Sequence, residues 1–165
     1  MIHLEDEQAT ATFGQRLVRA LGGRGAVHIS GELGAGKTTL CRAMIKELGH
    51  QGAVKSPTFT IVEPYELSGR RIFHIDLYRL TDANELNYLA IDEYYGDDCL
   101  CLVEWPERAA GQLPDHDVDV RLEGTALSGS GVKTATARSV SLKGSSQLGE
   151  KVCLELAQDY KHQGS

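Results

Sequence analysis

The chain has 165 residues, of which 24% are charged, and a formal net charge of −6. This length suits one domain with an ordinary buried core, and no apolar run is long enough to span a bilayer. The acidic balance and the scattered Lys and Arg residues argue against tight nucleic-acid binding by the chain alone, which usually requires a basic stripe. Docking onto a protein partner is compatible with this charge.

The cysteines and the N-terminus indicate a cytoplasmic protein with no membrane partner. The first residues are acidic where a signal peptide would be basic. The four cysteines form no C-x-x-C pair, and we expect them to be reduced packing residues. No histidine pair has ligand spacing, which makes a zinc site unexpected. The cysteines are Cys41, Cys99, Cys101 and Cys153.

The N-terminal third predicts a helix, a strand, a glycine-rich loop and a second helix. Residues 6–21 form an amphipathic pattern with apolar side chains four apart. Residues 26–30 are a short apolar run, and residues 39–48 carry a helical stripe that ends before Gly49. Between them, Gly31 to Thr38 reads G-x-x-x-x-G-K-T, the phosphate-binding loop pattern.

Each part of this loop matches a chemical need of a nucleoside triphosphate. Glycines let backbone N–H groups turn toward phosphate oxygens, and the following helix adds its positive end. Lys37 can reach the β- and γ-phosphates, and the Thr38 hydroxyl suits Mg²⁺, which prefers oxygen ligands. We expect ATP and Mg²⁺ as cofactors. The nucleotide-binding loop residues are Gly34, Ala35, Gly36, Lys37, Thr38 and Thr39.

The rest of the chain alternates strand-like and helix-like segments. Residues 59–67 and 71–76 predict a hairpin with its turn at residues 68–70. Residues 81–89 predict a helix capped by Thr81 or Asp82, and residues 92–98 a loop or short helix. Strands are expected at 99–103, 117–123 and 132–142, the last two separated by a turn over 124–131, and a helix carries Leu148, Val152 and Leu156. We predict one P-loop ATPase domain over residues 1–165, an α/β, P-loop NTPase-type three-layer fold with a mixed central sheet flanked by helices.

Two carboxylates end predicted strands and are candidates for the metal and the attacking water. Glu104 follows a run that is apolar on both faces, as expected of a central strand beside the loop. We assign Glu104, with Thr38, to the metal shell, and Asp76, with Lys37, to catalysis, Asp76 orienting or deprotonating the water. His74 is expected on the opposite face of its strand from Asp76, as a packed or partly exposed side chain.

Two further features follow the loop in the sequence. Ser56, Pro57 and Thr58 lie where nucleotide-sensing loops often occur, and a plain turn is the alternative. Trp105, the single tryptophan, follows Glu104 and could cover the active site, contact a partner or pack in the core.

Four blocks in this order closely resemble the bacterial TsaE family, formerly called YjeE: GELGAGKTT (31–39), KSPTF (55–59), HIDLYRL (74–80) and LVEWP (102–106). The resemblance runs from about Leu4 to at least Asp119. It implies a small P-loop ATPase that joins TsaB and TsaD to make threonylcarbamoyladenosine in tRNA, with ATP hydrolysis resetting the complex and tRNA contacted only indirectly. It also implies that Lys37 and the loop amides hold phosphate, Thr38 and Glu104 hold Mg²⁺, Asp76 lies near the γ-phosphate and Glu7 lies near the base. Residues 56–58 correspond to the family's switch-like loop.

Two other functional classes stay open on the residues alone. A P-loop small-molecule kinase would usually carry an arginine-bearing lid, for which only Arg70, Arg71 and Arg79 could serve. A non-catalytic nucleotide-dependent adaptor would bind ATP without turnover. A GTPase is disfavoured because no N-K-x-D segment is present. Slow hydrolysis by the isolated chain is expected, since no arginine finger is evident.

Overall fold

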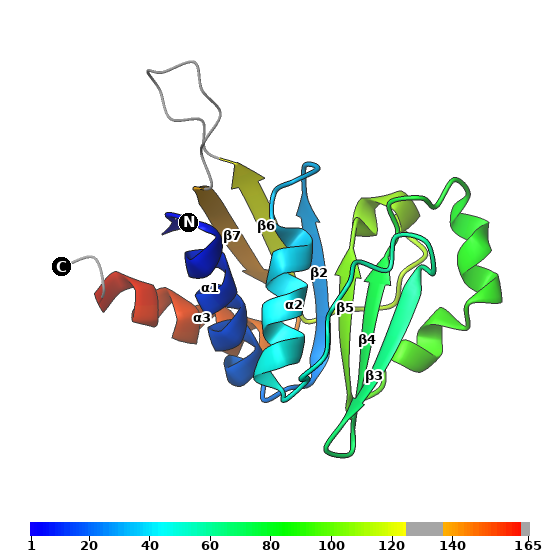
Figure 1. Cartoon of the computed structure of the whole chain (residues 1–165), viewed down its shortest axis with the longest axis horizontal. Coiled ribbons are helices and arrows are strands. Elements are labelled where there is room, and N and C mark those ends of the chain that lie inside the picture. Colours follow the sequence, from blue (N-terminus) through cyan, green and yellow to red (C-terminus); the bar gives the residue numbers. More distant parts are fainter. Residues whose placement is uncertain (125–136, 163–165) are drawn as a thin grey trace.

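The computed structural model describes residues 1–124 and 137–162 and contains one seven-stranded sheet in the order β1-β7-β6-β2-β5-β4-β3 (Figure 1). The strands are Ile2–Leu4 (β1), Gly25–Gly31 (β2), Val62–Leu67 (β3), Arg70–Asp76 (β4), Cys99–Glu104 (β5), Val118–Gly124 (β6) and Arg138–Gly144 (β7). β6, β2, β5 and β4 are parallel, whereas β3 and β7 run antiparallel to their neighbours. The predicted mixed sheet is therefore confirmed.

The central strands of the parallel part of the sheet, β2 and β5, are covered on both faces. Every residue of β5 is buried, as the continuous apolar run predicted. β5 lies between β2 and β4, so its C-terminal end is next to the loop that follows β2. β3 and β4 form the predicted hairpin. β3 starts later than expected, at Val62, because residues 57–61 form a turn, in which the Ile61 N–H donates to the Pro57 carbonyl.

Three α-helices bury their apolar stripes against one face of the sheet. They are Glu7–Ala20 (α1), Lys37–Glu47 (α2) and Gln147–His162 (α3). The Asp6 side chain caps α1 by accepting from the N–H of Ala9, which satisfies one of the free donors at a helix start. The main core joins side chains of all three helices, including Phe13, Leu40 and Leu156, to the inward side chains of β2, β5 and β6.

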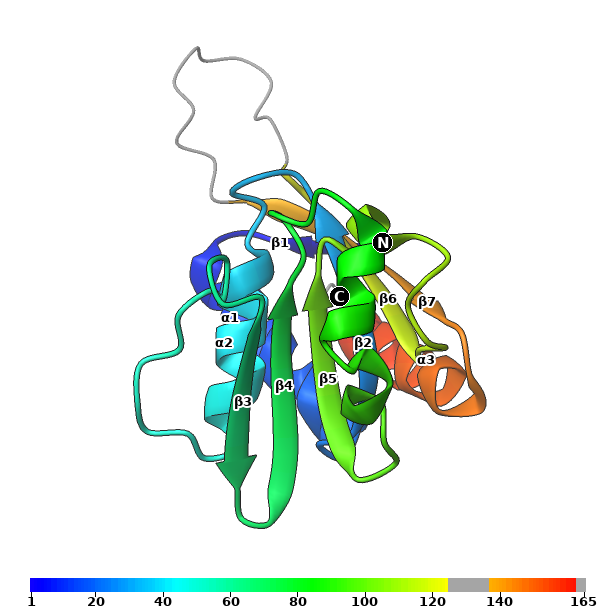
Figure 2. The same cartoon turned by 90° about the vertical axis from the view of Figure 1, so that its right-hand side faces the viewer.

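The other face is covered over β4 and β5 by three 3-10 helices, completing the third layer (Figure 2). They are Ala83–Tyr88 (η1), Ile91–Tyr94 (η2) and Pro106–Ala109 (η3). The predicted helix over 81–89 is this 3-10 segment. Asp82 is its N-cap, and the Asp82 N–H donates in return to the Glu85 carboxylate. Leu89 is its C-cap, and Ala90, with a φ of 48°, is the N-cap of η2. η3 and β1 have no counterpart in the sequence prediction.

Several remaining expectations can be compared with the described residues. The four cysteines are free, and three of them are fully buried. β7 covers the C-terminal half of the predicted strand 132–142, while its beginning and nearly all of the predicted 124–131 turn lie outside the described residues. Among the described helices, none is both long enough and apolar enough to cross a membrane.

The first turn of α3 packs so closely against the end of the loop before β6 that glycine is required at position 149. A Cβ at Gly149 would lie 1.8 Å from the carbonyl oxygen of Asp117. We expect Gly149→Ala to lower the free energy of unfolding by about 1–3 kcal/mol, because the helix must shift away from the sheet. Urea unfolding followed by circular dichroism measures this, with the exposed Gln158→Ala as the matched control. Equal urea midpoints for the two variants would contradict the packing argument.

Candidate nucleotide-binding site

The glycine-rich loop connects the end of β2 at Gly31 to the start of α2 at Lys37, the strand–loop–helix context that the motif requires. Gly36 is the N-cap of α2 with a left-handed φ of 102°. A Cβ there would meet the Nε of Arg138 at 2.6 Å, so a larger residue would displace that side chain, and the left-handed backbone itself favours glycine. The free N–H groups at the start of α2 and its positive dipole end lie at the C-terminal edge of the sheet.

Lys37 is held at the mouth of the loop by loop carbonyls and an aromatic ring. Its Nζ donates to the carbonyls of Gly31 (2.7 Å) and Glu32 (2.8 Å) and lies 3.8 Å from the ring centroid of Trp105. Burial lowers the pKa of Lys37, although the nearby carboxylates of Glu104 and others act in the opposite direction. The ammonium is thus positioned where a phosphate bound by the loop would meet it.

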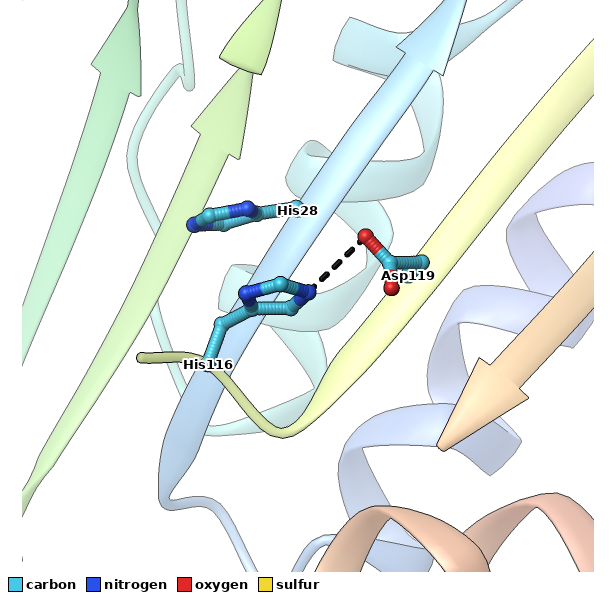
Figure 3. A group of neighbouring side chains, drawn as sticks. All are labelled: His28, His116 and Asp119. Carbon is cyan, nitrogen blue, oxygen red and sulfur yellow. Dashed lines mark ion pairs between the residues drawn. The ribbon is translucent and has the colours of Figure 1, made fainter. Parts of the chain in front are cut away.

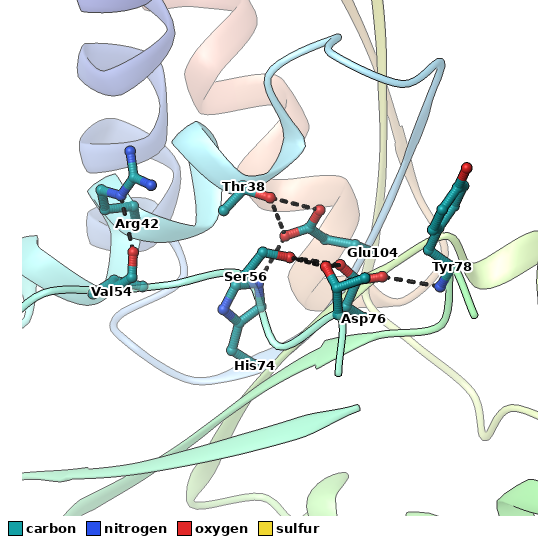
Figure 4. Close-up of polar contacts among 9 residues, drawn as sticks. Thr38, Arg42, Val54, Ser56, His74, Asp76, Tyr78 and Glu104 are labelled. Carbon is teal, nitrogen blue, oxygen red and sulfur yellow. Dashed lines mark hydrogen bonds and ion pairs between the residues drawn. The ribbon is translucent and has the colours of Figure 1, made fainter. Parts of the chain in front are cut away.

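Glu104 contacts the first turn of α2 directly (Figure 4). The Thr38 Oγ1 donates to the Glu104 carboxylate, 3.0 Å from each oxygen, and Glu104 is only 2% exposed. A hydroxyl and a carboxylate at this spacing are a donor set that fits a hard cation such as Mg²⁺. The predicted neighbourhood of Glu104 and Thr38 is therefore present in the structure.

The predicted face of His74 is wrong, whereas the expectation that this side chain is packed is confirmed. Residues two apart on a strand share a face, so His74 points to the same side as Asp76 and toward α2. His74 is fully buried, and its Nε2 donates to the Glu104 Oε1 at 2.7 Å. A histidine that orients a ligating carboxylate acts as an outer-shell partner of the ion.

A thiolate metal site beneath the loop is disfavoured, although Cys41, His74 and Glu104 each offer a ligand atom within 4.8 Å of the others. Burial, followed by the charge of Glu104, raises the pKa of the Cys41 thiol well above its ordinary value. An ion bound there would have to displace the thiol proton, which opposes binding. The oxygens of Thr38 and Glu104 are the donors that this end of the site offers.

Asp76 is the register partner of Glu104 on β4, and both of its oxygens are engaged. Oδ2 accepts from the hydroxyls of Ser56 (2.7 Å) and Thr58 (3.2 Å), and Oδ1 accepts from the N–H of Tyr78 (2.9 Å) (Figure 4). The segment that carries Ser56 is anchored to α2, because Arg42 donates to the Val54 carbonyl. Asp76 therefore connects the C-terminal end of β4 to residues 56–58.

A pocket of about 410 Å³ unites these groups and has a size typical of ligand sites. It is lined by the predicted residues Glu7, Gly34, Gly36, Lys37, Thr38, Thr39, Ser56, Thr58, Asp76, Glu104 and Trp105. Ala35 and Pro57 are buried and do not line it. At one side of the pocket, the hydroxyl of Thr39 donates to the carboxylate of Glu7 at 3.3 Å.

Three lining residues were missed: Leu33, Tyr78 and Arg138. Arg138 begins β7, and its Nε donates to the Ala35 carbonyl at 2.5 Å. An arginine therefore contacts the loop itself, although no arginine finger was evident in the sequence. It could not be found there because it lies about a hundred residues after the loop and belongs to no motif.

Of the three roles considered for Trp105, the structure shows two: its ring covers one side of the site, and it is partly packed. Its backbone is left-handed (φ 60°), and its partly buried ring covers Lys37 and lies against the ring of Tyr78, with centroids 5.0 Å apart. It also lines a second hollow together with Glu107 and Arg121. Trp105 thus covers one side of the site, and its contact with a partner stays a prediction.

A mixed α/β sheet with a phosphate-loop turn between its central strand and the next helix defines a P-loop NTPase-type fold. Comparison with a solved structure agrees with this class: YdiB of Bacillus subtilis superposes with a TM-score of 0.74 at 24% identity, covering 95% of this chain and 93% of that one. A family model described as "Threonylcarbamoyl adenosine biosynthesis protein TsaE" matches residues 4–131. The chain belongs to the TsaE family.

Individual relatives agree with this assignment. The chain is 50% identical over 97 residues to the tRNA threonylcarbamoyladenosine biosynthesis protein TsaE of Haemophilus influenzae, a match that covers 59% of this chain and 61% of that protein. It is 41% identical over 117 residues to the TsaE protein of Synechocystis, covering 68% and 73% of the two chains. The first match thus spans less than two thirds of the relative's length. The predicted resemblance is confirmed.

Proposed function

We propose that this chain is the Mg²⁺-dependent ATPase subunit that drives TsaB- and TsaD-type proteins in forming N6-threonylcarbamoyladenosine in tRNA. The pathway follows from the family and from the printed names of the relatives. The observation that carries the ATPase assignment is the Thr38 hydroxyl within hydrogen-bond distance of Glu104, directly behind the Lys37 loop. This arrangement unites a phosphate grip with oxygen donors for a hard cation.

The residues divide the work of hydrolysis between them. The loop amides and Lys37 would bind the triphosphate, and Thr38 and Glu104 would hold Mg²⁺, whose charge would offset the charge that develops on the phosphates. His74 keeps the Glu104 carboxylate aimed at α2. Asp76 orients the attacking water and accepts its proton. Arg138 steadies the loop through the Ala35 carbonyl.

Coupling to partners would run through the segment 54–58 and the exposed side chains near it. Ser56 and Thr58 contact Asp76, so a change around Asp76 reaches this segment without an intermediate residue. Phe59 is 80% exposed one residue further, with the Arg79 guanidinium 4.0 Å from its ring centroid. Exposed aromatic side chains with an arginine are a composition typical of protein interfaces.

Ser56→Ala is expected to lower partner-stimulated ATP hydrolysis about 10-fold, because a hydrogen bond to a charged group contributes about 1.5–3 kcal/mol. The ATP dissociation constant is expected to change less than about threefold, since Ser56 contacts Asp76 rather than the loop. Phosphate release with TsaB and TsaD present measures the first quantity and calorimetry the second. The exposed Thr60→Ala is the control. Equal loss in Thr60→Ala, or full stimulation in Ser56→Ala, would contradict the assignment.

The proposal as a whole is tested by mixing the chain with TsaB- and TsaD-type proteins, Mg²⁺, ATP and tRNA, and following phosphate release together with tRNA modification. We expect slow hydrolysis alone, faster hydrolysis in the mixture, and no tight salt-dependent complex between the isolated chain and tRNA. Nucleotide-dependent assembly without turnover would instead favour the adaptor. Phosphoryl transfer to a nucleoside or sugar would favour the kinase.

A further inference from the structure

A second group of metal-ligating side chains lies on the sheet face opposite to α1 and α2, away from the nucleotide pocket (Figure 3). His28 projects from β2 and Asp119 from β6, where they are register partners in the parallel pair. His116 lies in the turn that leads into β6. One ligand atom from each of the three side chains lies within 4.8 Å of the others.

We propose that His28, His116 and Asp119 form a binding site for a divalent transition-metal ion of the Zn²⁺ type. Two imidazoles and one carboxylate are a nitrogen-rich donor set that suits such ions, whereas Mg²⁺ prefers oxygen donors alone. Three protein ligands leave one position of a tetrahedral ion for water or another ligand. The site does not rest on the proposed ATPase function, because it shares no residue with the nucleotide pocket.

His28 has the properties of a pre-oriented ligand. The His28 Nε2 lies 3.0 Å from the hydroxyl of Tyr95, within hydrogen-bond distance. In the tautomer whose Nε2–H donates to Tyr95, Nδ1 carries the free lone pair. An outer-shell partner of this kind fixes the ring of a metal-binding histidine.

His116 and Asp119 each present a ligand atom that a cation could bind. The Nε2 of His116 is buried and lies 2.8 Å from the Asp119 Oδ1, yet it makes no aligned hydrogen bond within the described residues. The other carboxylate oxygen, Oδ2, is anchored by the Ser145 hydroxyl at 3.1 Å. An ion bound by both Nε2 and Oδ1 would satisfy the two atoms, once they separate from 2.8 Å to the wider spacing that two metal–ligand bonds of about 2.0–2.2 Å require.

Binding requires only a side-chain adjustment. The rings of His28 and His116 are stacked, with centroids 3.8 Å apart and planes 15° apart, so their in-plane lone pairs run nearly parallel. His116 belongs to a turn and keeps 22% of its side chain exposed, so its ring can rotate out of the stack toward Asp119. An ion held this way ties the turn before β6 to β2, and it should therefore stabilise the fold.

The test uses the full chain without a histidine tag, stripped with a chelator and free of nucleotide. Zn²⁺ is titrated in competition with a chromophoric chelator, and thermal unfolding is recorded with Zn²⁺ or Mg²⁺. We expect one Zn²⁺ per chain and an increase in Tm of about 5–10 °C at roughly 100-fold excess of free Zn²⁺ over its Kd, with no such increase from Mg²⁺. No Zn²⁺ binding by the folded protein would overturn the proposal.

Variants of the more exposed ligands locate the ion. His116→Ala and Asp119→Asn are each expected to raise the Kd for Zn²⁺ at least about 10-fold and to remove the increase in Tm, with folding verified by circular dichroism. His50→Ala removes a histidine whose ring packs on Tyr65 and should bind like the parent chain. Zn²⁺ bound with unchanged affinity in both ligand variants would place the ion elsewhere and overturn the site. This test does not measure ATP hydrolysis. Failure of the metal-site proposal can therefore be distinguished from failure of the proposed function.

Discussion

Replacing Glu104 with glutamine is expected to reduce Mg²⁺-dependent ATP hydrolysis about 100-fold or more. The change keeps the shape of the side chain but removes the charge that faces the Thr38 hydroxyl, and stabilisation of transition-state charge by a bound metal is worth several kcal/mol. His74 donates to the same carboxylate and would lose a charged acceptor as well. Binding of ATP without Mg²⁺ should change little, because the loop amides and Lys37 stay in place.

The measurement is phosphate release in the assembled complex as a function of Mg²⁺ concentration. Glu107→Gln is the matched control, because Glu107 is exposed and also lies near Lys37. Asp76→Asn should lower the rate while leaving the Mg²⁺ dependence intact. If Glu104→Gln hydrolyses ATP normally and Asp76→Asn loses its Mg²⁺ response, the roles assigned to the two carboxylates are exchanged.

Lys37→Ala is expected to weaken ATP binding about 10- to 100-fold, because hydrogen bonds to charged groups contribute about 1.5–3 kcal/mol. The Lys37 ammonium donates to the Gly31 and Glu32 carbonyls, so it needs only a short movement to reach a phosphate in the loop. Removing it also uncovers the face of the Trp105 ring. Hydrolysis should fall further than binding does, since charge grows on the phosphates in the transition state.

Calorimetric titration with ATP and with a slowly hydrolysed analogue measures this loss. Lys46→Ala is the control: it removes an exposed lysine from the last turn of the same helix, far from the loop. The loss in Lys37→Ala should be larger for the triphosphate than for adenosine, since Lys37 is assigned to phosphate. An equal loss for both would mean that the variant disturbs the pocket as a whole.

Local patterns predicted most of the elements because they depend on contacts within a few residues. The α1 stripe with Phe13 and Leu17 and the fully apolar β5 were readable in this way. The mixed sheet followed from the β3–β4 hairpin combined with that buried strand. The 3-10 geometry over Ala83–Tyr88 was not readable, because it depends on how a short segment with one buried side chain, Leu86, seats on the sheet.

In the candidate site, too, features local in the sequence were predictable, whereas contacts between distant residues were not. The loop pattern and the two strand-end carboxylates were readable because they are sequence-local, and their roles stay predictions. The side of His74 was misjudged, although strand periodicity alone should have placed it beside Asp76. The position of Arg138 against Ala35 was out of reach, because it depends on β7 returning to the sheet beside β6.

The sequence by itself determined the phosphate loop, the buried central strand that ends at Glu104, and membership of a family marked by four short blocks. Each is encoded in residues that are neighbours along the chain. Only the tertiary structure decided that His74 supports the Glu104 carboxylate, that Arg138 contacts the phosphate loop, and that His28 and His116, 88 positions apart, lie side by side. The physical reason is that strand order and register, set by burial of the whole sheet, choose which distant side chains share a face.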